Sequence, residues 1–140
     1  MSSIVRRYLK TAIVFLACGV AIGLWMLASR EFGIPLPPRG MSAHTHVILV
    51  GFVMMVIGGV ALWMFPRAAK DDVRYNPALA EWAYWCVTGG TALRAALELM
   101  AAPDATFAIR FALMTAGVMQ ATGVLLVFVM LLPRIRSTLP

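Results

Sequence analysis

Charged residues are scarce in this chain of 140 residues, where they make up only 13% of the sequence. Soluble domains average about 25% charged and about 45–50% apolar residues, whereas 61% of this chain is hydrophobic. Too little polar surface is available to cover a soluble globule of this length. The composition therefore predicts a membrane protein whose main surroundings are the lipid bilayer.

Other absences exclude further classes of protein. The two cysteines, Cys18 and Cys86, lie in apolar runs and form no Cys-x-x-Cys pair, which argues against a disulfide framework and against a zinc cluster. Motifs for nucleotides, for serine or cysteine nucleophiles and for paired carboxylates are also missing, so hydrolase or kinase chemistry is not expected. The net charge of +6 comes from basic residues at the ends of apolar runs, which favours lipid headgroups over nucleic acid.

Long apolar runs are what the chain has instead. A helix needs roughly 20 apolar residues to cross a bilayer, and four such runs cover residues 9–27, 43–65, 79–100 and 107–132. Together they occupy most of the chain and leave only short connections. The sequence predicts an all-α, polytopic membrane protein, with residues 1–140 forming a single transmembrane domain, a bundle of four helices.

Basic residues at the ends of these runs predict the orientation of the bundle. Lysines and arginines concentrate on cytoplasmic loops, and one side of the predicted bundle carries Arg6, Arg7, Lys10, Arg67, Lys70, Arg74, Arg134 and Arg136. The other side carries only Arg30, Arg39 and Arg110. Both termini are therefore predicted to be cytoplasmic, in a bacterial inner membrane, with the start of the second helix on the outer side.

Both histidines of the chain, His44 and His46, lie at this outer end. Residues on an α-helix are separated by about 100°, so side chains two positions apart point in nearly opposite directions and do not both face one ligand. His44 is predicted to share its face with Gly51, Met55 and Gly58, where small residues leave room for a flat macrocycle. A plainer interpretation is that the imidazoles are tolerated at the membrane boundary and that the glycines only let helices pack.

A resemblance to known proteins favours the first interpretation. The stretch AHTHVILVGFVMMVIGGVALWMFPR, residues 43–67, resembles the second helix of the catalytic subunit of heme–copper oxidases, especially of their nitric oxide reductase branch. It is also similar to short four-helix proteins related to oxidase subunit I, which share His44, His46, Gly51 and the Phe65-Pro66 pair. The resemblance implies that His44 is an axial ligand of the iron of a low-spin heme b.

The chain also departs from the large enzymes. It has no histidine after His46, so it lacks the ligands of an oxygen-reducing or nitric oxide-reducing binuclear centre, and enzymatic activity stays undecided. A sixth heme ligand would come from His46 after local unwinding, from a second copy of the chain, from a methionine or from nothing. A homodimer is expected, with the Gly19-x-x-x-Gly23 pair as a packing face. The methionine candidates are Met41, Met100 and Met114.

Arginines on the outer side are candidate partners of the heme propionates. Arg94 lies six residues before the end of the third predicted helix, about 9 Å deep at roughly 1.5 Å per residue, where an unpaired charge is costly. One interpretation pairs it with Glu98, four residues on. The other places Arg94, Arg110 and Arg39 around the anionic propionates, because arginine forms paired hydrogen bonds with carboxylates. Gln120, in the middle of the fourth predicted helix, is expected to bond to another helix.

Two functions follow from the sequence. The first is a membrane protein with heme b that transfers electrons to a redox partner, or that binds or senses a diatomic gas such as nitric oxide. The second is a heme-free accessory or assembly subunit whose His44-x-His46 pair binds copper or zinc, or no metal.

Overall fold

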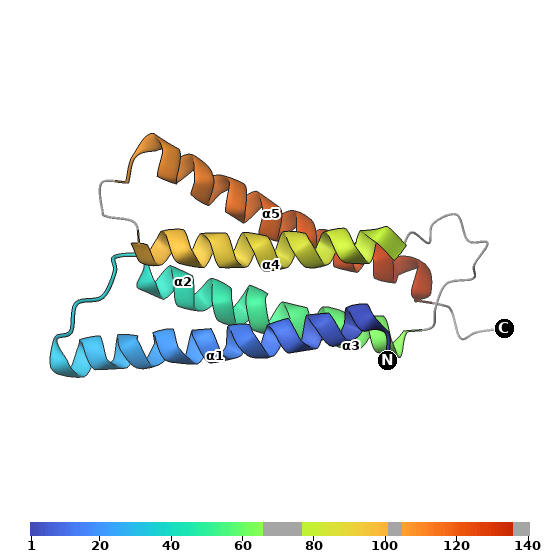
Figure 1. Cartoon of the computed structure of the whole chain (residues 1–140), viewed down its shortest axis with the longest axis horizontal. Coiled ribbons are helices and arrows are strands. Elements are labelled where there is room, and N and C mark those ends of the chain that lie inside the picture. Colours follow the sequence, from blue (N-terminus) through green and yellow to red (C-terminus); the bar gives the residue numbers. More distant parts are fainter. Residues whose placement is uncertain (66–76, 101–104, 136–140) are drawn as a thin grey trace.

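A computed structural model of the chain describes residues 1–65, 77–100 and 105–135 (Figure 1). All regular structure within these ranges is helical, which confirms the predicted all-α class. The elements are α1 (Ser3–Phe32), α2 (Gly40–His46), the π-helix η1 (Val47–Met54), α3 (Met55–Met64), α4 (Pro77–Met100), α5 (Phe107–Leu131) and the 3₁₀ turn η2 (Leu132–Arg134).

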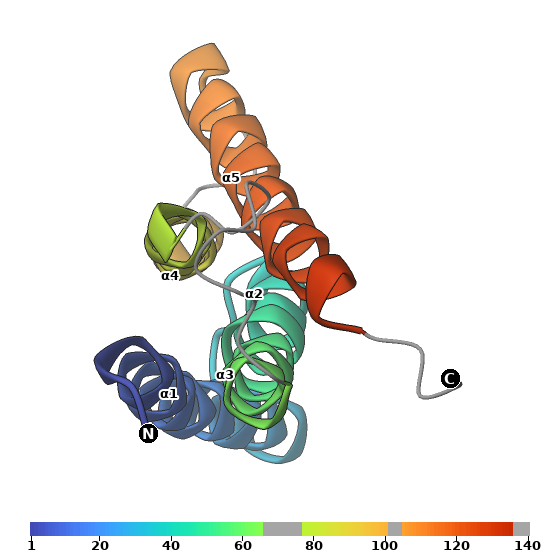
Figure 2. The same ribbon diagram turned by 90° about the vertical axis from the view of Figure 1, so that its right-hand side faces the viewer.

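The helices of the described residues form four rods, because α2, η1 and α3 follow one another without a break. The rod formed by these three segments lies beside α1 and α4, and α4 packs along α5. Helix α5 runs at an angle to the others, and its first half diverges from α4 (Figures 1 and 2). The end of the bundle where α1 stops and α2 begins is called the distal end below.

Three helices in the described part of the chain are long and apolar enough to cross a membrane: α1, the rod Gly40–Met64, and α5. Helix α4 has 24 residues but is more polar, since it carries Glu81, Arg94 and Glu98. The chain is thus a multi-pass membrane protein, while crossing by α4 and the cytoplasmic location of both termini stay predictions. Four of the basic residues used to predict orientation lie outside the described residues: Arg67, Lys70, Arg74 and Arg136.

Helix α1 extends beyond the predicted residues 9–27 in both directions and ends at a glycine with a left-handed backbone conformation. Gly33 adopts a left-handed conformation with φ of 67°, and its N–H bonds to the carbonyl of Ser29. Glycine takes this conformation without the penalty that a Cβ brings, which makes it a common helix stop. Hydrophobicity therefore predicted the apolar centre of the helix, whereas a glycine sets its actual end.

The glycines of α1 pack inside the chain. A Cβ added at Gly19 would lie 2.3 Å from Cδ1 of Ile48, and one added at Gly23 would lie 3.0 Å from Cε1 of His44. The face that the sequence suggested for a homodimer is thus covered by the chain's own second rod. Any second copy would have to use another surface.

Polar contacts at the other end of the bundle join α1 to α4. Arg7 forms an ion pair with Glu81 and lies over the ring of Tyr84, 5.3 Å from its centroid. The Tyr84 hydroxyl is 2.8 Å from Oγ1 of Thr11. These contacts satisfy the charge at the start of α4, which lipid would not do.

Helices α4 and α5 approach closely at two glycines. A Cβ added at Gly90 would lie 2.8 Å from the backbone nitrogen of Gln120, and one added at Gly123 would lie 2.7 Å from the backbone nitrogen of Val87. Backbone atoms move less readily than side-chain tips, and small residues are what permits such contact between membrane helices. This close packing holds α4 against α5 beyond the first half of α5, where the two helices diverge.

We expect Gly90→Ala and Gly123→Ala each to lower the free energy of unfolding by about 1–3 kcal/mol, the usual cost of overpacking. Gly89→Ala is the matched control, because a Cβ there would meet only the side-chain end of Met119 at 3.5 Å. Thermal melting of the detergent-solubilised protein, followed by circular dichroism, measures the difference. Equal melting of Gly89→Ala and Gly90→Ala would contradict the packing described above.

Candidate functional site

His44 is held against α1 by a hydrogen bond to the backbone. Its Nδ1 lies 3.0 Å from the carbonyl oxygen of Gly19. A carbonyl only accepts hydrogen bonds, so Nδ1 carries the proton and Nε2 keeps its lone pair. Metal-bound histidines commonly have this arrangement, in which one ring nitrogen donates to a carbonyl and the other binds the metal.

Glycine on α1 leaves the space that this ring occupies. A Cβ added at Gly23 would lie 3.0 Å from Cε1 and 3.9 Å from Nε2 of His44. Within the described part of the chain, Nε2 forms no hydrogen bond. The ring is thus oriented, cradled by glycine and left with one free nitrogen lone pair.

His46 has the same tautomer but lies on another side of α2. Its Nδ1 is 2.8 Å from the carbonyl oxygen of Ser42, and the Ser42 hydroxyl donates to Oε1 of Glu98 on α4 at 2.8 Å. Ser42 and His46 are four residues apart and share the helix face toward α4. His44 contacts α1 instead, so the two imidazoles diverge as the helical spacing predicted.

This divergence bears on the metal-binding alternative. A copper or zinc ion held by both histidines would need two nitrogens converging on one point, and the pair does not provide this. In addition, no group of three histidine, cysteine, aspartate or glutamate side chains that could hold a metal ion occurs within the described ranges. The geometry gives no support to a copper or zinc site on His44-x-His46.

The glycine-lined face predicted for His44 does not form one stripe. A Cβ at Gly51 would meet Phe15 of α1 at 2.7 Å, whereas a Cβ at Gly58 would lie between α5 and α1, 3.1 Å from Val127 and 3.6 Å from Tyr8. Met55 instead contacts Thr88 of α4 through its sulfur. The cause is η1, because a π-helix bonds residue i to i+5 and turns less per residue than an α-helix.

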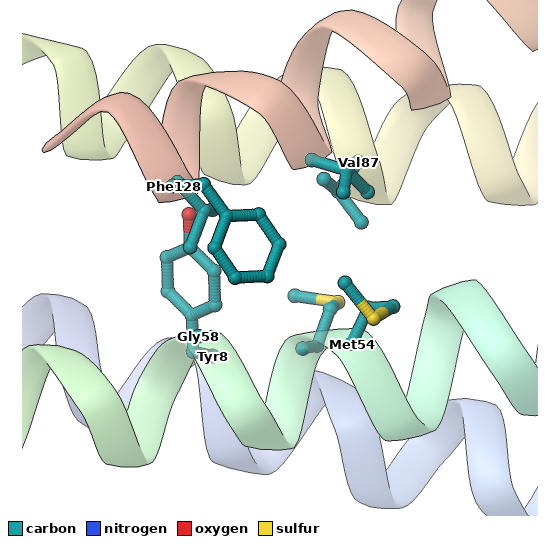
Figure 3. Close-up of a pocket in the computed structure, with 8 residues that line it drawn as sticks. Tyr8, Met54, Gly58, Val87 and Phe128 are labelled. Carbon is teal, nitrogen blue, oxygen red and sulfur yellow. The ribbon is translucent and has the colours of Figure 1, made fainter. Parts of the chain in front are cut away.

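Met55 and Gly58 therefore line a different feature, a small pocket in the middle of the bundle (Figure 3). Tyr8, Val87 and Phe128 close it from three other helices (Figure 3). Its volume of about 10 Å³ is no more than one water molecule needs, and its lining is apolar. Ligand pockets enclose roughly 300–1,000 Å³, so this pocket is a packing defect and not a cofactor site.

A larger cavity lies at the distal end, and Arg39, Arg94 and Arg110 all line it. We call it the arginine cavity; its volume is about 730 Å³. It lies between the start of α2, the end of α4 and the diverging first half of α5 (Figure 1). The rest of its lining is Ser42, Glu98, Leu113, Met114, Gly117, Val118 and Ala121.

A hydrogen-bonded network runs from this cavity into the bundle. Arg94 pairs with Glu98, Nε to Oε1 at 3.0 Å, which confirms the pair predicted from their spacing. Arg94 also donates to Oε1 of Gln120 at 3.3 Å, and Gln120 donates to Oγ1 of Thr91 at 3.0 Å. The expected bond from Gln120 to another helix is confirmed too.

The structure thus brings the three arginines together, but not around His44. They face the side of α2 that carries Ser42, while the His44 ring lies on the side of α1. Sequence reasoning missed Ser42 and the carboxylate of Glu98 as parts of the cavity. Their meeting depends on how α2 packs on α4, for which the sequence offers no local signal.

Comparison with known proteins gives one result. Residues 3–139 match the family model described as cytochrome c and quinol oxidase polypeptide I. Searches of curated proteins and of solved structures found no match.

Proposed function

The chain belongs to the cytochrome c and quinol oxidase polypeptide I family, and on this basis we propose that it holds a b-type heme through His44. The protein would act in electron transfer or in the binding or sensing of nitric oxide or another diatomic gas. We place it in a bacterial inner membrane. The family relation accounts for both the apolar helices and the resemblance of residues 43–67 to the second helix of oxidase subunits.

The orientation of His44 is the observation that carries this proposal. Members of the family generally bind hemes, and a heme iron takes neutral imidazole as an axial ligand. The hydrogen bond to Gly19 leaves the Nε2 lone pair of His44 available for such a role. Gly23 provides the clearance that the ring needs beside α1.

A bound heme would supply one-electron chemistry and affinity for diatomic gases. In this protein His44 would position it, and the surrounding lipid and helices would keep the site dry. The described chain offers no second histidine on the same side, because His46 faces α4. A second ligand of the iron would therefore come from a methionine, from a second copy of the chain in a homodimer or from a gas, or there would be none.

Absorption spectra of the purified protein test the proposal. Protein produced with full heme supply should show a Soret band with about one heme per chain, and a band shift on addition of nitric oxide would indicate gas binding. A low-spin spectrum that does not change when nitric oxide is added would indicate two strong ligands on the iron and a role in electron transfer. A colourless protein under the same conditions would leave the heme-free accessory subunit as the function.

A further inference from the structure

The arginine cavity carries more positive than negative charge. Among the described residues that line it, Arg39, Arg94 and Arg110 are basic and Glu98 alone is acidic. Arg94 is paired with that carboxylate, whereas Arg39 and Arg110 form no ion pair with an acidic side chain of residues 1–65, 77–100 or 105–135. Charges near a bilayer are costly when unpaired, so the cavity is suited to an anion.

Glu98 adds a second requirement for a molecule bound in the cavity, that of a hydrogen-bond donor. Its Oε1 accepts hydrogen bonds from Ser42 and Arg94, but its Oε2 is buried and has no partner in the described part of the chain. The side chain is only 5% exposed. A buried acceptor left unpaired costs about 1–3 kcal/mol, and more when it is charged. An occupant that donates a hydrogen bond would remove this cost.

The remaining wall of the cavity is apolar. Leu113, Met114 and Val118 follow Arg110 along α5, and Met114 and Val118 are 69% and 53% exposed. This wall therefore continues onto the outer surface of α5, along the half of the helix that diverges from α4 (Figures 1 and 2). A free anion would leave this wall uncovered, whereas a molecule with an acyl chain would cover it.

We propose that the arginine cavity binds an anionic phospholipid whose headgroup also carries a hydroxyl donor, of the phosphatidylglycerol type. The phosphodiester lies between Arg39 and Arg110, since guanidinium forms paired hydrogen bonds with phosphate. A glycerol hydroxyl donates to Oε2 of Glu98, and an acyl chain follows α5. The volume of about 730 Å³ is within the roughly 300–1,000 Å³ range of ligand pockets.

This lipid site is independent of the proposed heme. His44 lies toward α1 on another side of α2, and neither Gly19 nor Gly23 lines the arginine cavity. Loss of lipid binding and loss of heme binding are thus separate results.

Native mass spectrometry of the delipidated full chain in detergent tests the proposal with three lipids of equal chain length. Phosphatidylglycerol and phosphatidylmethanol carry the same charge, but only the first has headgroup hydroxyls; phosphatidylcholine has no net charge and no donor. We expect phosphatidylglycerol to bind about tenfold more tightly than phosphatidylmethanol, the value of one hydrogen bond to a charged group. Phosphatidylcholine should bind more weakly still.

Variants identify the residues involved. Arg39→Gln with Arg110→Gln should weaken phosphatidylglycerol binding by more than about tenfold. Arg30→Gln is the matched control, since Arg30 lies at the same end, is 80% exposed and pairs with Glu31. Glu98→Gln should bring the affinities for phosphatidylglycerol and phosphatidylmethanol close together. Circular dichroism checks that each variant keeps its helices.

Three results would overturn the lipid site. The first is equal binding of the three lipids by the unmodified chain. The second is phosphatidylglycerol binding by the double arginine variant at the level of Arg30→Gln. The third is displacement of the lipid by an equal concentration of sn-glycerol 3-phosphate, which would assign the cavity to a soluble phosphate.

Discussion

Replacing His44 with alanine is expected to weaken heme binding by at least about 100-fold, which would leave the purified protein nearly colourless. Loss of a group that only orients a metal ligand already costs roughly 10–100-fold in affinity, and loss of the ligand itself should cost more. The structure provides the reason for choosing this residue, because Gly19 fixes the tautomer in which Nε2 is free. Titration of the apoprotein with heme, followed at the Soret band, measures the effect.

His46→Ala is the matched control. His46 is the same residue type, lies two positions away and also bonds to a carbonyl, that of Ser42, but it faces α4. The His46→Ala variant should keep the heme affinity and the Soret band of the unmodified protein. If His46→Ala lost the heme and His44→Ala kept it, the ligand would be on the side of the arginine cavity.

Replacing Arg94 with methionine should lower the free energy of unfolding by about 3 kcal/mol. Breaking a buried ion pair typically costs about 3–5 kcal/mol because the remaining charge is left without compensation. The lower end applies here, since the Arg94 side chain is 25% exposed while that of Glu98 is 5% exposed. The variant also removes the bond to Gln120. Chemical or thermal unfolding in detergent measures the change.

Two further variants separate this cause from a general loss of packing. Arg30→Met removes a pair with Glu31 that is largely exposed, so it should cost less than about 1 kcal/mol. Adding Glu98→Gln to Arg94→Met should restore part of the stability, because it removes the uncompensated charge. If Arg94→Met unfolded at the same temperature as Arg30→Met, the network would have no structural importance.

Local sequence rules predicted much of the helical framework. Apolar runs about 20 residues long indicate helices by length alone, and the Arg94–Glu98 pair follows from i,i+4 spacing. The sequence predicted Arg39, Arg94 and Arg110 on the same side of the membrane, and all three line one cavity at the distal end. Each of these predictions depends only on positions along one helix or on its distance from the membrane surface.

Contacts between helices could not be predicted in the same way. The π-helix η1 rotates Met55 and Gly58 away from the face of His44. The prediction assumed the roughly 100° per residue of a regular α-helix and therefore missed this rotation. The close approach of α4 and α5 at Gly90 and Gly123 appears in the sequence only as two small residues. The side of α2 on which the arginines gather is therefore a result of tertiary packing.

Chemical rescue tests the central claim, that Nε2 of His44 binds a heme iron, most directly. His44→Gly leaves a space the size of an imidazole ring beside Gly23, which free imidazole can fill as a replacement ligand. We predict that this variant binds heme weakly by itself and regains the Soret band when imidazole is added, while the heme affinity of the unmodified protein does not depend on imidazole. Heme binding by His44→Gly at full affinity without imidazole would contradict the claim.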